Sequence, residues 1–124
     1  MNAKILYIED NEENMYLVTF MLKAHGHEVL QAWDGPEGVR VALDDRPDLI
    51  LLDIQLPGMD GYETARRLRA EPGLAGIPIV ALTSYAMAGD REKAMGAGCE
   101  GYIEKPINPD TFMIEIEAFL GSAP

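Results

Sequence analysis

The chain has 124 residues, 48% of them hydrophobic, so it can form one domain with a full core and needs no disulfide or structural metal to do so. Its single cysteine, Cys99, cannot form an internal disulfide and is expected to be buried in a reducing compartment. The net charge of −11 argues against a nucleic-acid partner, because contacts to phosphates need clustered Lys and Arg. The sequence contains no apolar run long enough to span a bilayer and no signal peptide, which predicts a cytoplasmic protein without membrane contact.

Short β-rich runs and helical periodicity alternate along the whole chain. Strands are expected at residues 4–8, 28–32, 49–52, 79–82 and 101–103. Helices are expected between the cap Asn11 and Gly26, from the cap Asp34 onward, at 62–70, at 85–98 and from Pro109 onward. Five strands that alternate with five helices predict a single-domain α/β fold, with a parallel sheet covered by helices on both faces.

Two histidines and the only tryptophan lie in turns and are given no role. His25 and His27 flank Gly26 between the first helix and the second strand, where we expect side chains at the surface. Trp33 follows the second strand and is expected to pack there or to lie partly exposed.

The segment at 47–61 organises the rest of the chain. Its run at residues 49–52 is apolar without alternation, which indicates a central strand buried on both faces. Asp53 ends this run, and Pro57, Gly58 and Gly61 predict a loop before the next helix. A carboxylate at the carboxyl end of a central parallel strand lies at the edge where open α/β sheets bind their ligands.

Polar side chains follow the other strands as well. Glu9 and Asp10 follow the first strand, Thr83 follows the fourth, and Lys105 lies near the end of the fifth. We expect them to gather around Asp53, because the carboxyl ends of parallel strands lie at one edge of a sheet. Three carboxylates there would repel one another unless a hard divalent cation such as Mg²⁺, or the ammonium of Lys105, compensates their charge. A carboxylate in that setting can accept a phosphoryl group, whose oxygens the Thr83 hydroxyl can bind.

Four motifs resemble, in order, those of the receiver domain of two-component response regulators, and the resemblance covers essentially the whole chain. They are IEDN at 8–11, DLILLDIQLPGMDG at 48–61, ALTSYA at 81–86 and YIEKPI at 102–107. The resemblance implies a doubly wound, flavodoxin-type and CheY-like sheet in the order 2-1-3-4-5. It also implies that residues 1–124 are one receiver domain with no output domain, similar to stand-alone regulators of the DivK type.

The resemblance assigns roles to the residues that handle phosphate. Asp53 matches the phosphoacceptor of the family, while Thr83 and Lys105 match the hydroxyl and the amine that bind the phosphate. Tyr102 matches the aromatic residue that turns inward when the domain switches. The bond between Lys105 and Pro106 matches a peptide bond that is usually cis in the family.

The resemblance also implies a Mg²⁺ site. Glu9 and Asp10 match the acidic pair around the ion, and Asp53 and the backbone carbonyl of Gln55 complete the protein ligands. Many members of the family have Asp where this chain has Glu9, and the longer side chain can reach the ion through a water molecule.

The function implied is a protein-interaction switch controlled by phosphorylation. The phosphoryl group would come from a phosphohistidine of a histidine kinase or a histidine phosphotransferase protein. The chain would catalyse only its own Mg²⁺-dependent phosphorylation and dephosphorylation. A downstream protein would bind the face formed by the last two helices and the fifth strand.

Three other functions fit the sequence less well. A phosphohydrolase of the haloacid dehalogenase type uses a second Asp two residues after its nucleophile, where this chain has Gln55. A flavin carrier needs a hydroxyl- or glycine-rich phosphate loop after the first strand, but the loop at 9–13 carries four carboxylates. A degenerate receiver that works without phosphate is disfavoured because Asp53, Thr83 and Lys105 are all present.

Overall fold

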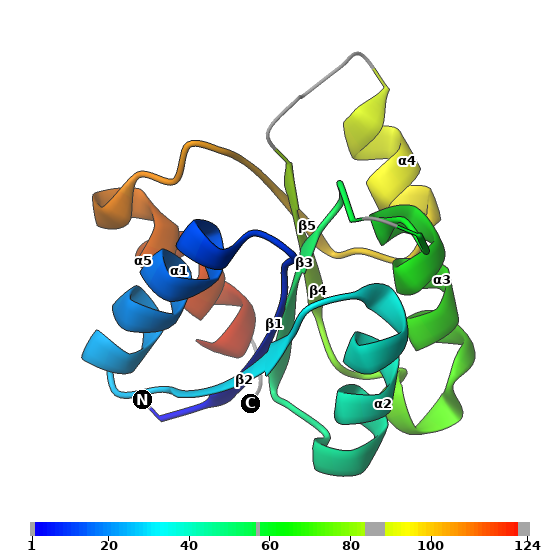
Figure 1. Ribbon diagram of the computed structural model, residues 1–124, viewed down its shortest axis with the longest axis horizontal. Coiled ribbons are helices and arrows are strands. Elements are labelled where there is room, and N and C mark those ends of the chain that lie inside the picture. The colour runs from blue at the N-terminus through cyan, green and yellow to red at the C-terminus, as the bar shows by residue number, and fades with distance from the viewer. Residues whose placement is uncertain (1, 57, 84–88, 122–124) are drawn as a thin grey trace.

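Figure 1 shows a computed structural model of the protein, which describes residues 2–56, 58–83 and 89–121. One parallel sheet is formed by β1 (Lys4–Ile8), β2 (Glu28–Ala32), β3 (Leu49–Asp53), β4 (Ile79–Thr83) and β5 (Gly101–Glu104). The strand order β2-β1-β3-β4-β5 confirms the predicted doubly wound topology.

Helices cover both faces of the sheet, as predicted. The described part of the chain contains α1 (Glu12–Ala24), α2 (Gly35–Asp45), α3 (Gly61–Ala70), α4 (Asp90–Gly96), α5 (Pro109–Gly121) and a short 3₁₀ helix, η1 (Pro72–Leu74). α1 and α5 lie on one face, and α2, α3 and α4 lie on the other (Figure 1). None of the described helices is long and apolar enough to cross a bilayer.

Alternate residues of each strand supply two separate hydrophobic cores. In β1, Leu6 and Ile8 face the core under α2, α3 and α4, whereas Ile5 and Tyr7 face the core under α1 and α5. Every residue of β3 is buried, which confirms that this strand is covered on both faces. The two cores fix β3 in the middle of the sheet, so Asp53 at its carboxyl end is held in a rigid frame.

The predicted caps at Asn11 and Asp34 also form. The side chain of Asn11 accepts a hydrogen bond from the backbone N–H of Asn14 at 2.9 Å, and Asp34 accepts one from Glu37 at 2.8 Å. α1 therefore begins directly beside the acidic residues that follow β1.

The loop after β3 folds back closely onto the end of that strand. The backbone N–H of Gly61 donates to the carbonyl of Ile54 at 3.0 Å, and a Cβ at Gly61 would lie 2.3 Å from the Cα of Ile54. Only glycine fits this approach, which brings the start of α3 next to Asp53. Pro57 of the same loop lies outside the described residues.

Two sequence predictions differ from the structure. The helix expected at 85–98 begins at Asp90, because Gly89 has a φ of 89°, in the left-handed region that a right-handed helix excludes. Residues 84–88, the end of the ALTSYA motif among them, lie outside the described part. His27, expected at the surface, is buried because Glu117 of α5 and the backbone of Ala3 bind its ring nitrogens, whereas His25 is exposed as predicted.

Candidate functional site

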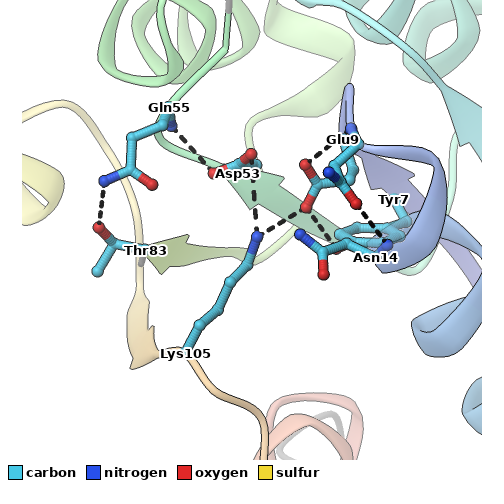
Figure 2. Close-up of polar contacts among 8 residues, drawn as sticks. Tyr7, Glu9, Asn14, Asp53, Gln55, Thr83 and Lys105 are labelled. Carbon is cyan, nitrogen blue, oxygen red and sulfur yellow. Dashed lines mark hydrogen bonds and ion pairs between the residues drawn. The ribbon is translucent and has the colours of Figure 1, made fainter. Parts of the chain in front are cut away.

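Side chains from four neighbouring strand ends meet at the carboxyl edge of the sheet. Glu9 follows β1, Asp53 ends β3, Thr83 ends β4, and Lys105 follows β5 and points back across the edge (Figure 2). Glu9, Asp53 and Thr83 are all buried, and Lys105 is largely so. The topology therefore brings together the residues that the sequence placed at separate strand ends.

Glu9 is held by three hydrogen bonds. Its Oε1 accepts from the hydroxyl of Tyr7 at 2.8 Å and from Nζ of Lys105 at 2.7 Å, and its Oε2 accepts from the backbone N–H of Asn11 at 3.2 Å. Burial and the neighbouring Glu9 carboxylate raise the pKa of Tyr7, so its hydroxyl remains a donor.

The site predicted from the sequence did not include Tyr7, although its position in the strand indicates that it lies near Glu9. It lies two residues before Glu9, and side chains two residues apart in a strand point to the same side.

Asp53 lies beside Glu9 and accepts fewer hydrogen bonds. Its Oδ1 accepts from the backbone N–H of Gln55 at 3.0 Å, and its Oδ2 is 3.9 Å from Nζ of Lys105. Burial, followed by hydrogen bonding with Glu9, raises the pKa of Asp53 to about 7. Burial acts against ionisation of Glu9 too, but hydrogen bonds from Asp53, Lys105 and Tyr7 outweigh it and lower the pKa of Glu9. The two carboxyls titrate as a pair, and the opposite directions of their pKa shifts favour the proton on Asp53 rather than on Glu9.

The carboxylates form a cluster that fits a hard divalent cation. Glu9, Asp10 and Asp53 each offer an oxygen, and the three atoms lie within 4.8 Å of one another. Asp10 is exposed, so the cluster is open to solvent on one side. An all-oxygen donor set at this spacing is typical of Mg²⁺ and Ca²⁺ sites. Gln55, the fourth residue of the predicted metal site, lies two residues after Asp53 with its backbone N–H bound to that carboxylate.

Gln55 also connects the cluster to Thr83. Its side-chain Nε2 donates to Oγ1 of Thr83 at 3.1 Å, a contact that the sequence did not indicate (Figure 2).

Tyr102 lies one strand further on, in β5, and packs against the core under α2, α3 and α4. Its hydroxyl is inaccessible to solvent, and the Arg91 guanidinium lies 5.5 Å from its ring centre. The bond between Lys105 and Pro106 is cis.

The fold and this site define a class of protein: a doubly wound α/β domain with a buried aspartate and an acidic cluster at the carboxyl edge of its sheet. Residues 5–117 match the family described as the response regulator receiver domain. The chain belongs to this family and is a response regulator of two-component signalling.

Individual relatives agree with this assignment. The polar-differentiation response regulator DivK of Brucella anthropi is 42% identical over 123 residues, which cover 99% of this chain and 100% of that protein. DivK of Brucella ovis is 41% identical with the same coverage. These matches confirm the resemblance to DivK-type regulators that the motifs indicated.

Solved structures confirm the CheY-like fold. The receiver domain of the sensor histidine kinase PA1611 from Pseudomonas aeruginosa, crystallised with a magnesium ion coordinated in its active site cleft, is 36% identical. It has a TM-score of 0.90 and covers 98% of this chain and 99% of that chain. The chemotaxis protein CheY4 of Vibrio cholerae is 29% identical, with a TM-score of 0.91 and coverage of 97% and 100%.

Proposed function

We propose that this response regulator accepts a phosphoryl group on Asp53 from a phosphohistidine of a histidine kinase or a histidine phosphotransferase protein. Mg²⁺ is the cofactor, and phosphorylation changes the surface that binds a downstream protein. The observation that carries the proposal is the setting of the Asp53 carboxylate. It is buried at the carboxyl edge of the sheet, 3.9 Å from Nζ of Lys105 and clustered with Glu9 and Asp10.

The donor set supports the choice of Mg²⁺. Asp10 and Asp53 are direct ligands in this proposal, together with the backbone carbonyl of Gln55. Glu9 already accepts three hydrogen bonds, so its part is to act through water. When bound, the cation neutralises charge on the transferring phosphoryl oxygens.

Asp53 is the nucleophile in the proposed transfer. One of its carboxylate oxygens forms a bond to phosphorus while the phosphorus–nitrogen bond of the phosphohistidine breaks. The carboxyl reacts in its ionised form, which the Lys105 ammonium favours against the effect of burial on its pKa, as a cation held by the cluster would too. Lys105 and the hydroxyl of Thr83 then donate hydrogen bonds to the phosphoryl oxygens. We propose that the chain catalyses only its own Mg²⁺-dependent phosphorylation and dephosphorylation.

A surface that suits a phosphodonor protein lies next to the acidic cluster. α1 begins beside Asp10 and exposes Tyr16, Leu17 and Phe20, with Tyr16 73% and Phe20 62% accessible and their rings stacked. Large apolar side chains exposed together typically mark a protein-binding surface. The net charge of −11 favours a partner with basic groups around such a contact and disfavours nucleic acid.

The proposed output face is formed by α4, β5 and α5. Arg91, Tyr102, Glu104 and Phe112 are among the residues that line a cavity of about 320 Å³ on this face. Tyr102 lines this cavity and packs against the core under α2, α3 and α4, on the strand next to the one that ends at Thr83. In the proposal, a movement of Thr83 towards a phosphoryl group alters the space around the Tyr102 ring. The hydroxyl of Tyr102 is already inaccessible to solvent, which makes the proposed change a repacking of Tyr102 rather than a full turn from outside.

Incubation with acetyl phosphate and Mg²⁺ followed by intact mass spectrometry tests the proposal. Wild type should gain one phosphoryl group and Asp53→Asn none, because Glu9, the other buried carboxylate of the cluster, is held by hydrogen bonds from Tyr7, Lys105 and Asn11. Asp60→Asn is a matched control, since Asp60 caps α3 and Asn caps helices equally well, and it should be labelled as wild type is. Stoichiometric labelling of Asp53→Asn would falsify the assignment.

A further inference from the structure

Gln55 contacts both the candidate phosphoacceptor and the hydroxyl that is proposed to bind the phosphate. We infer that its side chain is a positioning residue that holds the Thr83 hydroxyl in the resting protein and opposes its movement towards a phosphoryl group on Asp53. This inference rests on the proposed function, because it concerns the step that follows phosphorylation.

The geometry shows one residue bound to two elements of the site. The backbone N–H of Gln55 donates to Oδ1 of Asp53 at 3.0 Å, which fixes the start of the loop against the end of β3. From this fixed point its side chain reaches across to β4 and donates to Oγ1 of Thr83 at 3.1 Å (Figure 2). Asp53 pairs with Leu82 in the sheet, so Thr83 lies one residue beyond the level of the phosphoacceptor.

The chemistry of the two side chains makes this contact a restraint. A threonine hydroxyl has one donor and two acceptor positions, and a glutamine amide offers both a donor and an acceptor, so either end of the amide can hold it. Thr83 is buried and its χ1 angle is limited to a few staggered positions. Turning the hydroxyl from Gln55 towards Asp53 therefore changes its rotamer or shifts the end of β4, and the contact with Gln55 is lost in either case.

The exposure of Gln55 determines how much the loss of its hydrogen bond to Thr83 should change the switching equilibrium. A hydrogen bond between neutral groups contributes modestly to an equilibrium, and this one lies at a partly solvated position, where it is at the weak end. Removing the restraint should raise the population of the switched state by about two- to fivefold. The same factor should appear in the affinity for a phosphoryl mimic, because the mimic binds the switched state more tightly.

Beryllofluoride, the aspartyl-phosphate mimic, provides the test as a double-mutant cycle. Its apparent Kd is measured at saturating Mg²⁺ for wild type, Gln55→Met, Thr83→Val and the double variant, with backbone NMR of Tyr102 as a second readout. Met is close to Gln in length but cannot form the hydrogen bond, and Val keeps the shape of Thr without the hydroxyl. We expect Gln55→Met to bind about two- to fivefold more tightly and to shift Tyr102 at lower concentration. In the Thr83→Val background the Gln55→Met exchange should have no effect.

A third background separates the hydroxyl from the shape of the side chain. Thr83→Ser retains the hydroxyl, so Gln55→Met should still increase the affinity there. An equal gain in the Thr83→Val background, or no gain with Thr83 present, would overturn the inference while leaving phosphorylation of Asp53 intact. If wild type binds no beryllofluoride, or binds it as well after Asp53→Asn, the proposed function fails and the inference fails with it.

Discussion

Polar side chains are buried at both ends of the sheet, but the hydrogen bonds and charges around them differ. At the amino end, Nδ1 of His27 accepts from the backbone N–H of Ala3 at 3.1 Å, and its Nε2 bonds the Glu117 carboxylate of α5 at 2.8 Å. Because Nδ1 is an acceptor, Nε2 carries the proton and donates it to Glu117. At the carboxyl end, Glu9 and Asp53 both lie beside the ammonium of Lys105, at 2.7 and 3.9 Å.

The difference separates a structural contact from a functional one. At the amino end each ring nitrogen of His27 has one matched partner, so the contact ties α5 to the start of β2 and leaves neither nitrogen of the buried ring unpaired. At the carboxyl end the carboxylates outnumber the ammonium, and burial holds the pKa of Asp53 far above its usual range. Negative charge that is not fully compensated is typical of functional sites, because it remains available to a cation or to a reacting group.

The largest expected effect is at the amino end. His27→Ala should destabilise the protein by about 3 kcal/mol, because it removes a buried side chain and leaves a backbone donor and a carboxylate without their partner. Chemical denaturation measures this, and the loss should be the same with and without Mg²⁺.

The neighbouring histidine is the matched control for that variant. His25 is exposed, and its Nδ1 lies 3.7 Å from the same Glu117 carboxylate, so His25→Ala should change the stability by less than about 0.5 kcal/mol. Similar losses for the two variants would contradict the role assigned to His27.

The next effect is a pH dependence that arises at the carboxyl end. The pKa of Asp53 is raised from 3.8 to about 7, so the folded protein binds more protons than the unfolded chain between these values. Its stabilising contribution is therefore complete below pH 3.8 and is lost as the pH rises through 7. Without Mg²⁺, wild type should lose about 2 kcal/mol relative to Asp53→Asn between pH 5 and pH 8.

The comparison with Asp53→Asn removes the contribution of the other titrating groups, which are common to both proteins, apart from Glu9, which is coupled to Asp53. Glu9 contributes in the opposite sense, since its pKa is lowered, but that contribution is lost only as the pH falls below its usual value of 4.5. Parallel stability curves for the two proteins from pH 5 to pH 8 would show that Asp53 is not protonated at neutral pH.

Local sequence patterns predicted the carboxyl end well. The apolar run before Asp53 indicated a strand buried on both faces, and the alternation of strands and helices implied a parallel sheet, so the polar residues after the strands had to share one edge. The caps at Asn11 and Asp34 could also be predicted, because each depends on residues only three positions apart.

Contacts that depend on how individual side chains pack, and not on the order of the strands, could not be predicted from the sequence. His27 lies in a turn, and nothing near it in the sequence indicates that Glu117, 90 residues later, covers it. The bond from Gln55 to Thr83 joins the loop after β3 to the end of β4 through side-chain rotamers, which no periodicity describes. The burial of the Tyr102 hydroxyl likewise depends on how β5 packs against its neighbours.

The account's central claim is that charge at the carboxyl end destabilises the metal-free protein and that Mg²⁺ relieves it. Urea denaturation at pH 8 of wild type, Asp53→Asn and Asp10→Asn, with and without Mg²⁺, tests this most directly. Wild type should be the least stable of the three without the ion and should gain about 1.4 kcal/mol at tenfold Kd, while both variants gain much less. An equal gain for all three proteins, or a metal-free wild type more stable than Asp53→Asn, would contradict the claim.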